Sequence, residues 1–311
     1  MVDDACPEHS ADVLVPISDA RILVIRHTLN QGVGGATLSG LRCAIQDGCE
    51  IIVKMDGDGQ MDPLYLRDLC DPIAAGMCDF AKGSRFVHLA SLRSMPFVRR
   101  AGNIGLNFLT KFASGQWHIS DPTDGYLAVH REAAKVFNAD RISRRFFFEI
   151  SLLIRLNIIR AVALDIAIPA HYNNDRSSLN VTRCFLGFPP RLIWGFLNRL
   201  FWRYYFYDVN ATTLCLSVGL VSTGFGVGFG LFRWFTGVHS GQLQSADTVA
   251  LSLLPTIVGV QLVLQALVLD VIDRPYLPIS RLLGSQIEWL DQPARSRSGF
   301  RLFHPRSKNA E

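Results

Sequence analysis

The sequence predicts an α/β domain followed by an interfacial helix and a two-helix transmembrane hairpin. Strand-like and helix-like segments alternate through the first half of the chain. The short apolar run 51–55 ends abruptly in Asp and Gly, as a buried strand of an α/β sheet does. Residues 211–232 and 248–269 carry no charge, and at ~1.5 Å per residue each is long enough for ~30 Å of hydrocarbon.

Composition also indicates that part of the chain is embedded in a membrane. Of the 311 residues, 49% are hydrophobic and only 19% are charged, and the mean hydropathy is +0.21. The net charge of +4 comes without a long Lys/Arg block, which argues against a nucleic-acid partner. Seven cysteines without a CxxC pair argue against structural zinc and a disulfide framework, so we expect reduced, cytosol-facing thiols or buried small apolar residues.

The order of elements follows from apolar periodicity and from turn residues. Asn30 is the expected cap of the first helix, and Pro63 occupies the favoured first position of the second. The stretch 144–153 is expected to be amphipathic. The expected strands are 21–26, 51–55, 79–86 and 161–169, and the expected helices are 32–46 and 63–75.

The acidic loop that follows residues 51–55 is the first candidate site. Asp56 and Asp58 come directly after the strand, where ligands bind in open α/β sheets. The neighbouring glycines allow the backbone to approach a ligand closely. Together with Gln60 the two carboxylates offer only hard oxygen ligands, which suit Mg²⁺ or Mn²⁺. A polar turn that ends a strand would give the same pattern.

Residues 55–63, MDGDGQMDP, resemble the DxD region of glycosyltransferase family 2, in its polyprenyl-phosphate (dolichyl-phosphate mannosyltransferase-like) branch. The resemblance covers roughly residues 2–270 and implies a GT-A (Rossmann-like) domain that binds a nucleotide-sugar. In such a domain Asp56, Asp58 and Gln60 would bind the metal and the donor diphosphate, with Asp58 as a catalytic residue.

Two N-terminal segments fit the same resemblance. Residues 2–4 resemble the end of the family's second strand, which implies that Asp4, with Asp3, recognises the nucleobase; a frayed acidic terminus is the alternative. The family's first strand would precede this point, so we expect an N-terminally truncated domain. The Gly-rich segment 32–40 would receive phosphate at a helix N-terminus, or serve tight helix–sheet packing.

Further matching segments supply the other expected ligands. Arg85 in a Gly-Ser-Arg segment and Arg99 would hold the acceptor phosphate and act in catalysis, since guanidinium grips phosphate with two bonds. A solvated Arg99–Arg100 pair is the alternative. Arg176 and Ser178 lie in a polar loop that resembles the family's closing loop. Donor binding is implied for Asp121 and Gly125, and Glu149 matches an acidic position of the family.

The C-terminal part divides at shifts of composition. Residues 1–182 would form the GT-A domain, 183–210 an interfacial region rich in aromatic residues and Arg, 211–272 two transmembrane helices, and 273–311 a basic cytoplasmic tail. Buried core helices are the alternative for the apolar pair. Arg-rich flanks on both sides of the hairpin place the catalytic domain on the cytoplasmic side of the cytoplasmic membrane.

These features together predict an inverting transferase. It would move a sugar from a GDP- or UDP-sugar to undecaprenyl or dolichyl phosphate with Mg²⁺ or Mn²⁺, in the synthesis of glycans or cell-envelope polysaccharide. A non-catalytic degenerate paralogue or scaffold, and a family 2 enzyme with another lipid acceptor, are the alternatives. A homo-oligomer is compatible with the sequence.

Overall fold

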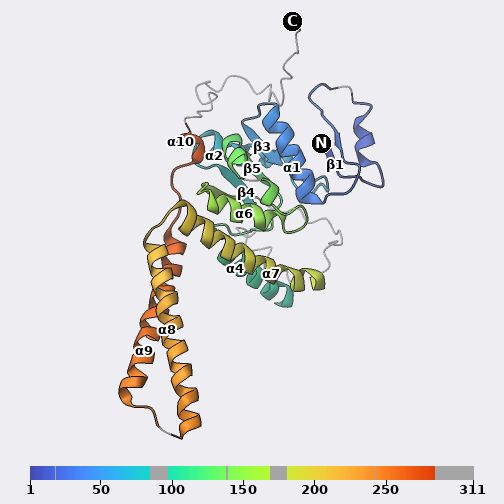
Figure 1. Ribbon diagram of the computed structural model, residues 1–311. Coiled ribbons are helices and arrows are strands. Elements are labelled where there is room, and N and C mark those ends of the chain that lie inside the picture. The colour runs from blue at the N-terminus through green and yellow to red at the C-terminus, as the bar shows by residue number, and fades with distance from the viewer. Residues whose placement is uncertain (18, 85–96, 138, 169–180, 242, 284–311) are drawn as a thin grey trace. The chain divides into compact units, whose positions relative to one another are not determined.

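The computed structural model describes residues 1–17, 19–84, 97–137, 139–168, 181–241 and 243–283 (Figure 1). The chain forms two compact units. The first comprises residues 1–199 and 275–311, and the second comprises residues 200–274. The first unit is therefore interrupted in sequence by the second, and each is described by itself.

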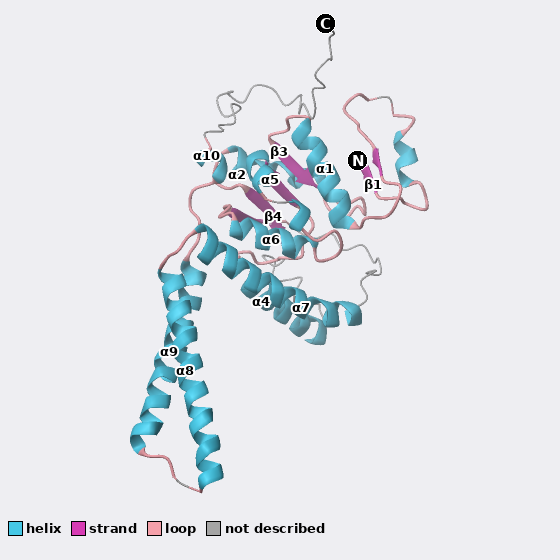
Figure 2. Cartoon of the chain, viewed as in Figure 1, coloured by secondary structure: helices cyan, strands magenta, loops and turns pink. Residues whose placement is uncertain are grey.

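A four-stranded mixed sheet is the centre of the first unit (Figure 2). Its order is β3 (Ile51–Lys54), β5 (Leu127–His130), β4 (Phe80–Ser84) and β6 (Ala163–Ala167). β5 runs antiparallel to both neighbours, and β4 and β6 are parallel. The carboxyl ends of β3, β4 and β6 therefore meet at one edge of the sheet, beside the amino end of β5.

Helices cover both faces of this sheet. Phe80 and Leu127 pack on one face against α1 (Val33–Gln46), α5 (Arg131–Val136) and α6 (Phe148–Ile158). Ala81 and Tyr126 pack on the other against α2 (Leu66–Ala74). Apart from Glu149, every residue of α6 is buried, so the expected amphipathic pattern of 144–153 is wrong for this helix. The α/β class is confirmed.

Three smaller parts complete the described elements of the first unit. The expected strand 21–26 is shorter than predicted: β2 (Ile25–Arg26) pairs in parallel with β1 (Val2–Asp3) in a separate two-stranded sheet. Helices α4 (Phe97–Ser114) and α7 (Val181–Leu200) lie side by side, with Phe112 stacked on Phe196 at 4.5 Å. The remaining elements are α10 (Ile279–Leu282) and the 3₁₀ turns η1 (Ser10–Leu14), η2 (Pro63–Tyr65) and η4 (Ala139–Arg141).

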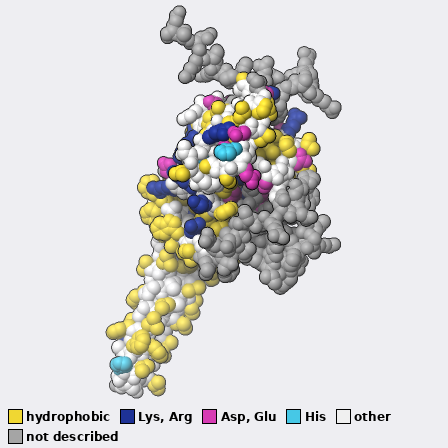
Figure 3. All heavy atoms as spheres, turned by 90° about the vertical axis from the view of Figure 1, so that its right-hand side faces the viewer, with side chains coloured by type: hydrophobic (Ala, Val, Ile, Leu, Met, Phe, Trp, Pro, Cys, Tyr) yellow, Lys and Arg dark blue, Asp and Glu magenta, His cyan; other side chains and the backbone are white. Residues whose placement is uncertain are grey.

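The second unit is a helical hairpin of α8 (Ala211–Ser240) and α9 (Ala246–Ile272), preceded by a π-helix, η5 (Phe201–Tyr207). Both long helices are apolar enough to cross a membrane, and only 11% of the most apolar stretch of each is buried. That low burial argues against core helices of a soluble domain. Hydrophobic side chains cover much of the hairpin face in Figure 3. α8 extends beyond the uncharged stretch 211–232, so Arg233 is helical.

Glycines allow the two helices of the hairpin to pack closely. A Cβ on Gly219 would lie 2.9 Å from the carbonyl oxygen of Gly259, and one on Gly226 would lie 2.7 Å from the carbonyl oxygen of Ser252. Small residues at a helix interface are a common packing device in lipid. Two polar contacts link η5 to the C-terminal end of α9. Arg203 forms an ion pair with Asp273 at 2.7 Å, and the Tyr204 hydroxyl donates a hydrogen bond to Oδ1 of Asp270 at 2.5 Å.

Candidate active site

Three ionisable residues lie in one row across the sheet. Lys54 on β3 and Lys82 on β4 are both paired in register with Leu127 of β5, and Lys82 is paired with Asp165 of β6. Paired residues on neighbouring strands point to the same face, so the two ammonium groups and the carboxyl group lie on the face covered by α6. Glu149 reaches this row from α6.

Asp56 lies just beyond β3 and forms an ion pair with Lys54. The Lys54 Nζ atom is 2.9 Å from Oδ1 and 3.1 Å from Oδ2 of Asp56, and it is 3.7 Å from Oε1 of Glu149. The Lys54 side chain is 8% exposed, whereas that of Asp56 is 34% exposed. At the end of β3, the half-buried carboxylate of Asp56 is therefore held by the nearly buried ammonium group of Lys54.

Gly125, two residues before the start of β5, packs directly against this ion pair. A Cβ at position 125 would lie 2.5 Å from Oδ2 of Asp56 and 2.7 Å from Nζ of Lys54. Such distances are too short for a carbon contact, so only glycine fits here without a shift. The resemblance implied a close approach at Gly125; what approaches it here is the Asp56–Lys54 pair.

Asp56 also lines an open pocket of about 490 Å³, made by the acidic loop and the start of η2. Asp58 is exposed on this loop, and its Oδ1 accepts a hydrogen bond from the Gln60 amide at 3.0 Å. The loop is closed by Asp62, which caps η2 by accepting from the Leu64 amide at 2.9 Å. The pocket residues are Met55, Asp56, Gly57, Gly59, Met61, Asp62 and Pro63.

The acidic loop offers a divalent cation only part of a coordination sphere. Among the described residues, no group of three His, Cys, Asp or Glu side chains could hold a metal ion. Asp56 and Asp58 nevertheless provide carboxylate oxygens beside an open pocket. Mg²⁺ commonly takes one or two carboxylates and completes its shell with substrate phosphates and water. The donor set therefore fits a cation that shares its ligands with a bound diphosphate.

Lys82 is buried, with 1% of its surface exposed, and donates a hydrogen bond to the carbonyl oxygen of Asp124. Burial lowers its pKa, while the negative charges of Asp124, Glu149 and Asp121 oppose that shift. Burial likewise raises the pKa of Glu149, and Lys54 and Lys82 act against it. These opposite shifts describe a network of buried charges of both signs, a feature shared by functional sites and structural ion-pair networks.

Asp121, an expected donor ligand, is fully buried in the loop before β5. Its Oδ1 accepts from the Thr123 hydroxyl at 3.1 Å and the Thr123 amide at 3.4 Å. Burial raises the pKa of Asp165, and the hydrogen bond that its carboxylate accepts from the Ser120 amide opposes this rise. The charge of Asp121 acts on both Lys82 and Asp165, so Asp121 belongs to the same buried network.

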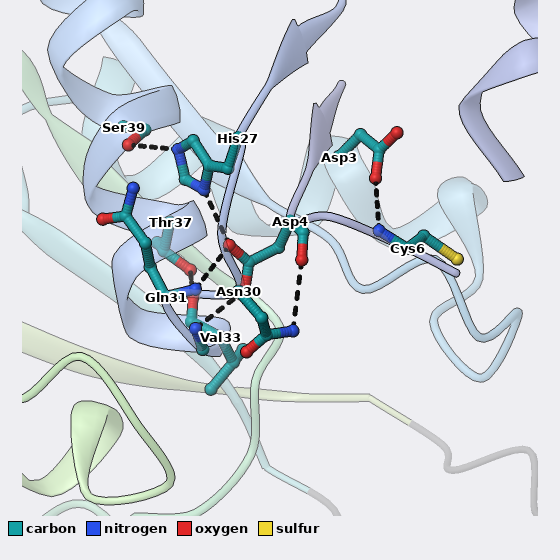
Figure 4. Close-up of polar contacts among 10 residues, drawn as sticks. Asp3, Asp4, Cys6, His27, Asn30, Gln31, Val33, Thr37 and Ser39 are labelled. Atoms are coloured by element: carbon teal, nitrogen blue, oxygen red, sulfur yellow. Dashed lines mark hydrogen bonds and ion pairs between the residues drawn. The ribbon is translucent and has the colours of Figure 1, made fainter. Parts of the chain in front are cut away.

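Asp4 lies in the separate two-stranded region (Figure 4). Its carboxylate accepts hydrogen bonds from the amides of Gln31 at 2.9 Å and Gly32 at 2.7 Å, and Oδ1 lies 2.7 Å from Nδ1 of His27. Burial acts to raise the pKa of Asp4, but these hydrogen bonds outweigh it and lower the pKa. Asp3 is buried, and its Oδ1 accepts from the Cys6 amide at 2.9 Å.

The start of α1 differs from its prediction. Asn30 does not cap the helix: Gly32 occupies the N-cap position, and the Asn30 side chain donates to the Asp4 carbonyl oxygen at 3.1 Å. The Asp4 carboxylate satisfies the amides just before the helix instead. A Cβ on Gly34 would lie 2.9 Å from Cβ of Phe148, which favours tight packing as the role of these glycines.

The expected acceptor ligands cannot be compared with this geometry. Arg85, Arg176 and Ser178 lie outside the described residues, and Arg99 lies in α4 with its side chain outside them. Sequence reasoning overlooked Lys54 and Lys82. The available signal was a lysine within each of two predicted strands, since a lysine is seldom buried in a strand unless its ammonium group is paired.

The fold and this strand-end network define a class: a ligand-binding α/β domain with its site at the carboxyl ends of the strands. Comparison with known proteins gives a narrower class. Residues 1–137 match the model of glycosyl transferase family 2. This part of the chain is similar to family 2 glycosyltransferases, and the resemblance of residues 55–63 to that family is confirmed.

Three relatives show how far the likeness extends. An uncharacterised protein of Methanocaldococcus jannaschii is 35% identical over 146 residues, which are 47% of this chain and 58% of the relative. The UDP-N-acetylglucosamine–dolichyl-phosphate N-acetylglucosaminyltransferase of Methanococcus voltae is 33% identical over 40% of this chain and 50% of its own. The undecaprenyl-phosphate mannosyltransferase of Micrococcus luteus is 27% identical over 50% and 64%. The match spans less than two thirds of each relative.

Proposed function

We propose that this protein transfers a sugar from a nucleotide-sugar to a polyprenyl phosphate at a membrane. The observation that carries the proposal is the Asp56–Asp58 loop, which lines an open pocket at the carboxyl end of β3 in a domain similar to family 2 glycosyltransferases. Two relatives are named as transferases that act on dolichyl or undecaprenyl phosphate, and this chain has two helices of transmembrane length. The acceptor would enter from the bilayer.

The proposed reaction is a single displacement at the anomeric carbon of the sugar, which inverts its configuration. The acceptor phosphate oxygen attacks as an anion, so the site need not supply a general base. The chain's task is to position both substrates and to balance their negative charge. Arg85, Arg99, Arg176 and Ser178 are the proposed ligands of the acceptor phosphate, and Asp4, Asp121 and Gly125 are proposed to shape the donor site.

Asp56 and Asp58, with Gln60, are the residues that would hold Mg²⁺ or Mn²⁺ against the donor diphosphate. When bound, such an ion supplies positive charge to the leaving nucleoside diphosphate. Lys54 holds the Asp56 carboxylate in place, and Asp58 is exposed on the same loop, where, among the described residues, only the Gln60 amide donates to its carboxylate. Asp58 is therefore the residue on which metal-dependent transfer should depend most.

The membrane assignment follows from the same reasoning. We propose residues 183–210 as an interfacial region and 211–272 as the spanning hairpin. Residues 1–182 would form the catalytic domain in the cytoplasm, and residues 273–311 would be a cytoplasmic tail whose helix α10 packs into the core of the first unit. The exposed aromatic side chains of Trp194, Phe201, Phe206 and Tyr207 support an interfacial position, because such rings favour the headgroup region.

Sugar transfer by purified full-length protein tests this function. Undecaprenyl and dolichyl phosphate would be offered with a panel of GDP- and UDP-sugars, with and without Mn²⁺. We expect one metal-dependent lipid product, and its loss by at least 100-fold in Asp58→Ala, with Arg67→Ala on the exposed side of α2 as the control. A chain that binds no nucleotide and forms no product with any donor would refute the proposal.

A further inference from the structure

A positive charge from the end of β3 lies beside the acidic loop. Both carboxylate oxygens of Asp56 lie within 3.1 Å of the Lys54 Nζ atom. The same nitrogen lies 3.7 Å from Glu149, so one ammonium group serves two carboxylates. Asp56 is thus already paired with a cation that belongs to the chain.

This ammonium group is fixed in position. Lys54 is the last residue of β3, its backbone is held in register with Leu127, and its side chain is 8% exposed. The backbone at Gly125 closes the space beside it, since even a methyl group there would lie 2.7 Å from Nζ. Glu149 on the buried helix α6 holds it from another side. The ammonium group therefore has little room to turn away when another cation arrives.

A divalent ion at Asp56 would consequently bind close to a like charge. In a partly buried site that repulsion is substantial, because the local dielectric constant is well below that of water. A diphosphate changes the balance: its negative charges attract the metal ion and the ammonium group together. Free metal should therefore bind poorly to this loop, and metal should bind well when a nucleoside diphosphate is present.

We propose that Lys54 is a positioning residue that acts as the fixed counter-cation of Asp56, so that the acidic loop takes up a divalent cation together with the donor diphosphate and not before it. This inference rests on the proposed function, because it concerns the order in which that site is filled. Asp58, which is exposed and two residues further along the loop, then supplies the chain's main contact with the ion.

Mn²⁺ binding to the purified full-length protein tests the role of Lys54 without any measurement of transfer. The titration would follow the electron paramagnetic resonance signal of free Mn²⁺, first with Mn²⁺ alone and then with UDP or GDP present. In the wild type we expect nucleotide to tighten Mn²⁺ binding by at least 10-fold. In Lys54→Met we expect Mn²⁺ alone to bind at least 10-fold more tightly, with a smaller further effect of nucleotide.

Two further variants separate charge from folding. Lys54→Met combined with Glu149→Gln removes one positive and one negative charge, and should keep the tighter Mn²⁺ binding if Lys54→Met alone proves unstable. Lys135→Met removes an ammonium group that pairs with Glu132 at 2.9 Å on the exposed side of α5, and should bind Mn²⁺ as the wild type does. Thermal unfolding would show that each variant is folded.

Each result has one meaning. Mn²⁺ affinity within two-fold of wild type in both Lys54 variants would overturn the counter-cation role and leave Lys54 as a structural residue, while the proposed function could still stand. Tighter Mn²⁺ binding in these variants supports that role even if no sugar is transferred. Failure of the wild type to bind UDP or GDP would count against the proposed function, and the titration with Mn²⁺ alone would still decide the role of Lys54.

Discussion

Replacement of Gly125 by alanine tests whether the acidic loop packs as described. The new Cβ would lie 2.5 Å from Oδ2 of Asp56, 0.9 Å closer than the 3.4 Å at which ordinary van der Waals contact begins. It would also lie 2.7 Å from Nζ of Lys54. The backbone at Gly125 has no positive φ, so the change is purely one of space.

The magnitude depends on which group moves. Asp56 is 34% exposed and Lys54 only 8% exposed, so the carboxylate should shift outward by roughly 1 Å while the ammonium group stays. The cost in stability should then lie near the lower end of the ~1–3 kcal/mol typical of overpacking. A shift of ~1 Å in a ligand-binding carboxylate can lower turnover by about 100-fold. Gly125→Ala should therefore impair transfer much more than folding.

Chemical unfolding and kcat/KM for sugar transfer measure the two effects side by side. Gly57→Ala is the matched control for stability: it lies in the same loop, has nothing within 4 Å of its Cβ position, and should change the free energy of unfolding by less than about 0.5 kcal/mol. If Gly125→Ala unfolds and turns over like the wild type, the close contact between β5 and the Asp56–Lys54 pair is wrong.

Three further predictions concern stability. Burial raises the pKa of Cys78 from 9.0 to about 12 and that of Cys70 to about 11. Above pH 9 the unfolded chain loses these protons first, so the free energy of unfolding should fall as pH rises toward 12, by at most about 1.4 kcal/mol per pH unit for each thiol. In the double variant Cys70→Ala/Cys78→Ala, the free energy of unfolding measured by urea titration should depend less steeply on pH. Asp79→Ala should destabilise the protein by about 2–4 kcal/mol in the same assay, because the buried carboxylate accepts hydrogen bonds from the amides of Val162, Ile279 and Ser280; an unchanged midpoint would contradict those bonds. Gly226→Leu should separate α8 from α9 and lower the melting temperature in detergent, whereas Gly228→Leu, with nothing within 4 Å of its Cβ position, should not; equal effects would argue against the glycine interface.

The sequence allowed the fold to be predicted where the pattern was local. The strand at 51–55 and the two long apolar helices were predicted from runs of one residue type, and the structure has them as β3 (Ile51–Lys54), α8 and α9. The strand at 21–26 was predicted too long, because only Ile25 and Arg26 find a partner strand in β1. Strand length depends on pairing between distant segments, which a local pattern does not contain.

The site shows the same division. Asp56 and Asp58 were predicted from one short loop, and that loop does line a pocket. The partner of Asp56 was not predicted, although Lys54 is only two residues away, because its burial depends on α6 and on Gly125 of β5. The hydrogen bonds from the Gln31 and Gly32 amides to Asp4 were also missed, since the one from Gly32 joins residues 28 positions apart in the chain. Interactions made by folding are the part that residue spacing alone does not reveal.

The discontinuity of the first unit has a practical consequence for obtaining that unit in soluble form. Ending the chain at Arg199 would remove the hairpin, but it would also delete α10, whose first amides satisfy the carboxylate of Asp79, and Ile279 from the core. The buried carboxylate of Asp79 would then lose two of its three amide donors. Excising residues 200–274 and joining Arg199 to Pro275 through a short Gly-Ser linker would retain both. Ligand binding could then be measured in plain buffer.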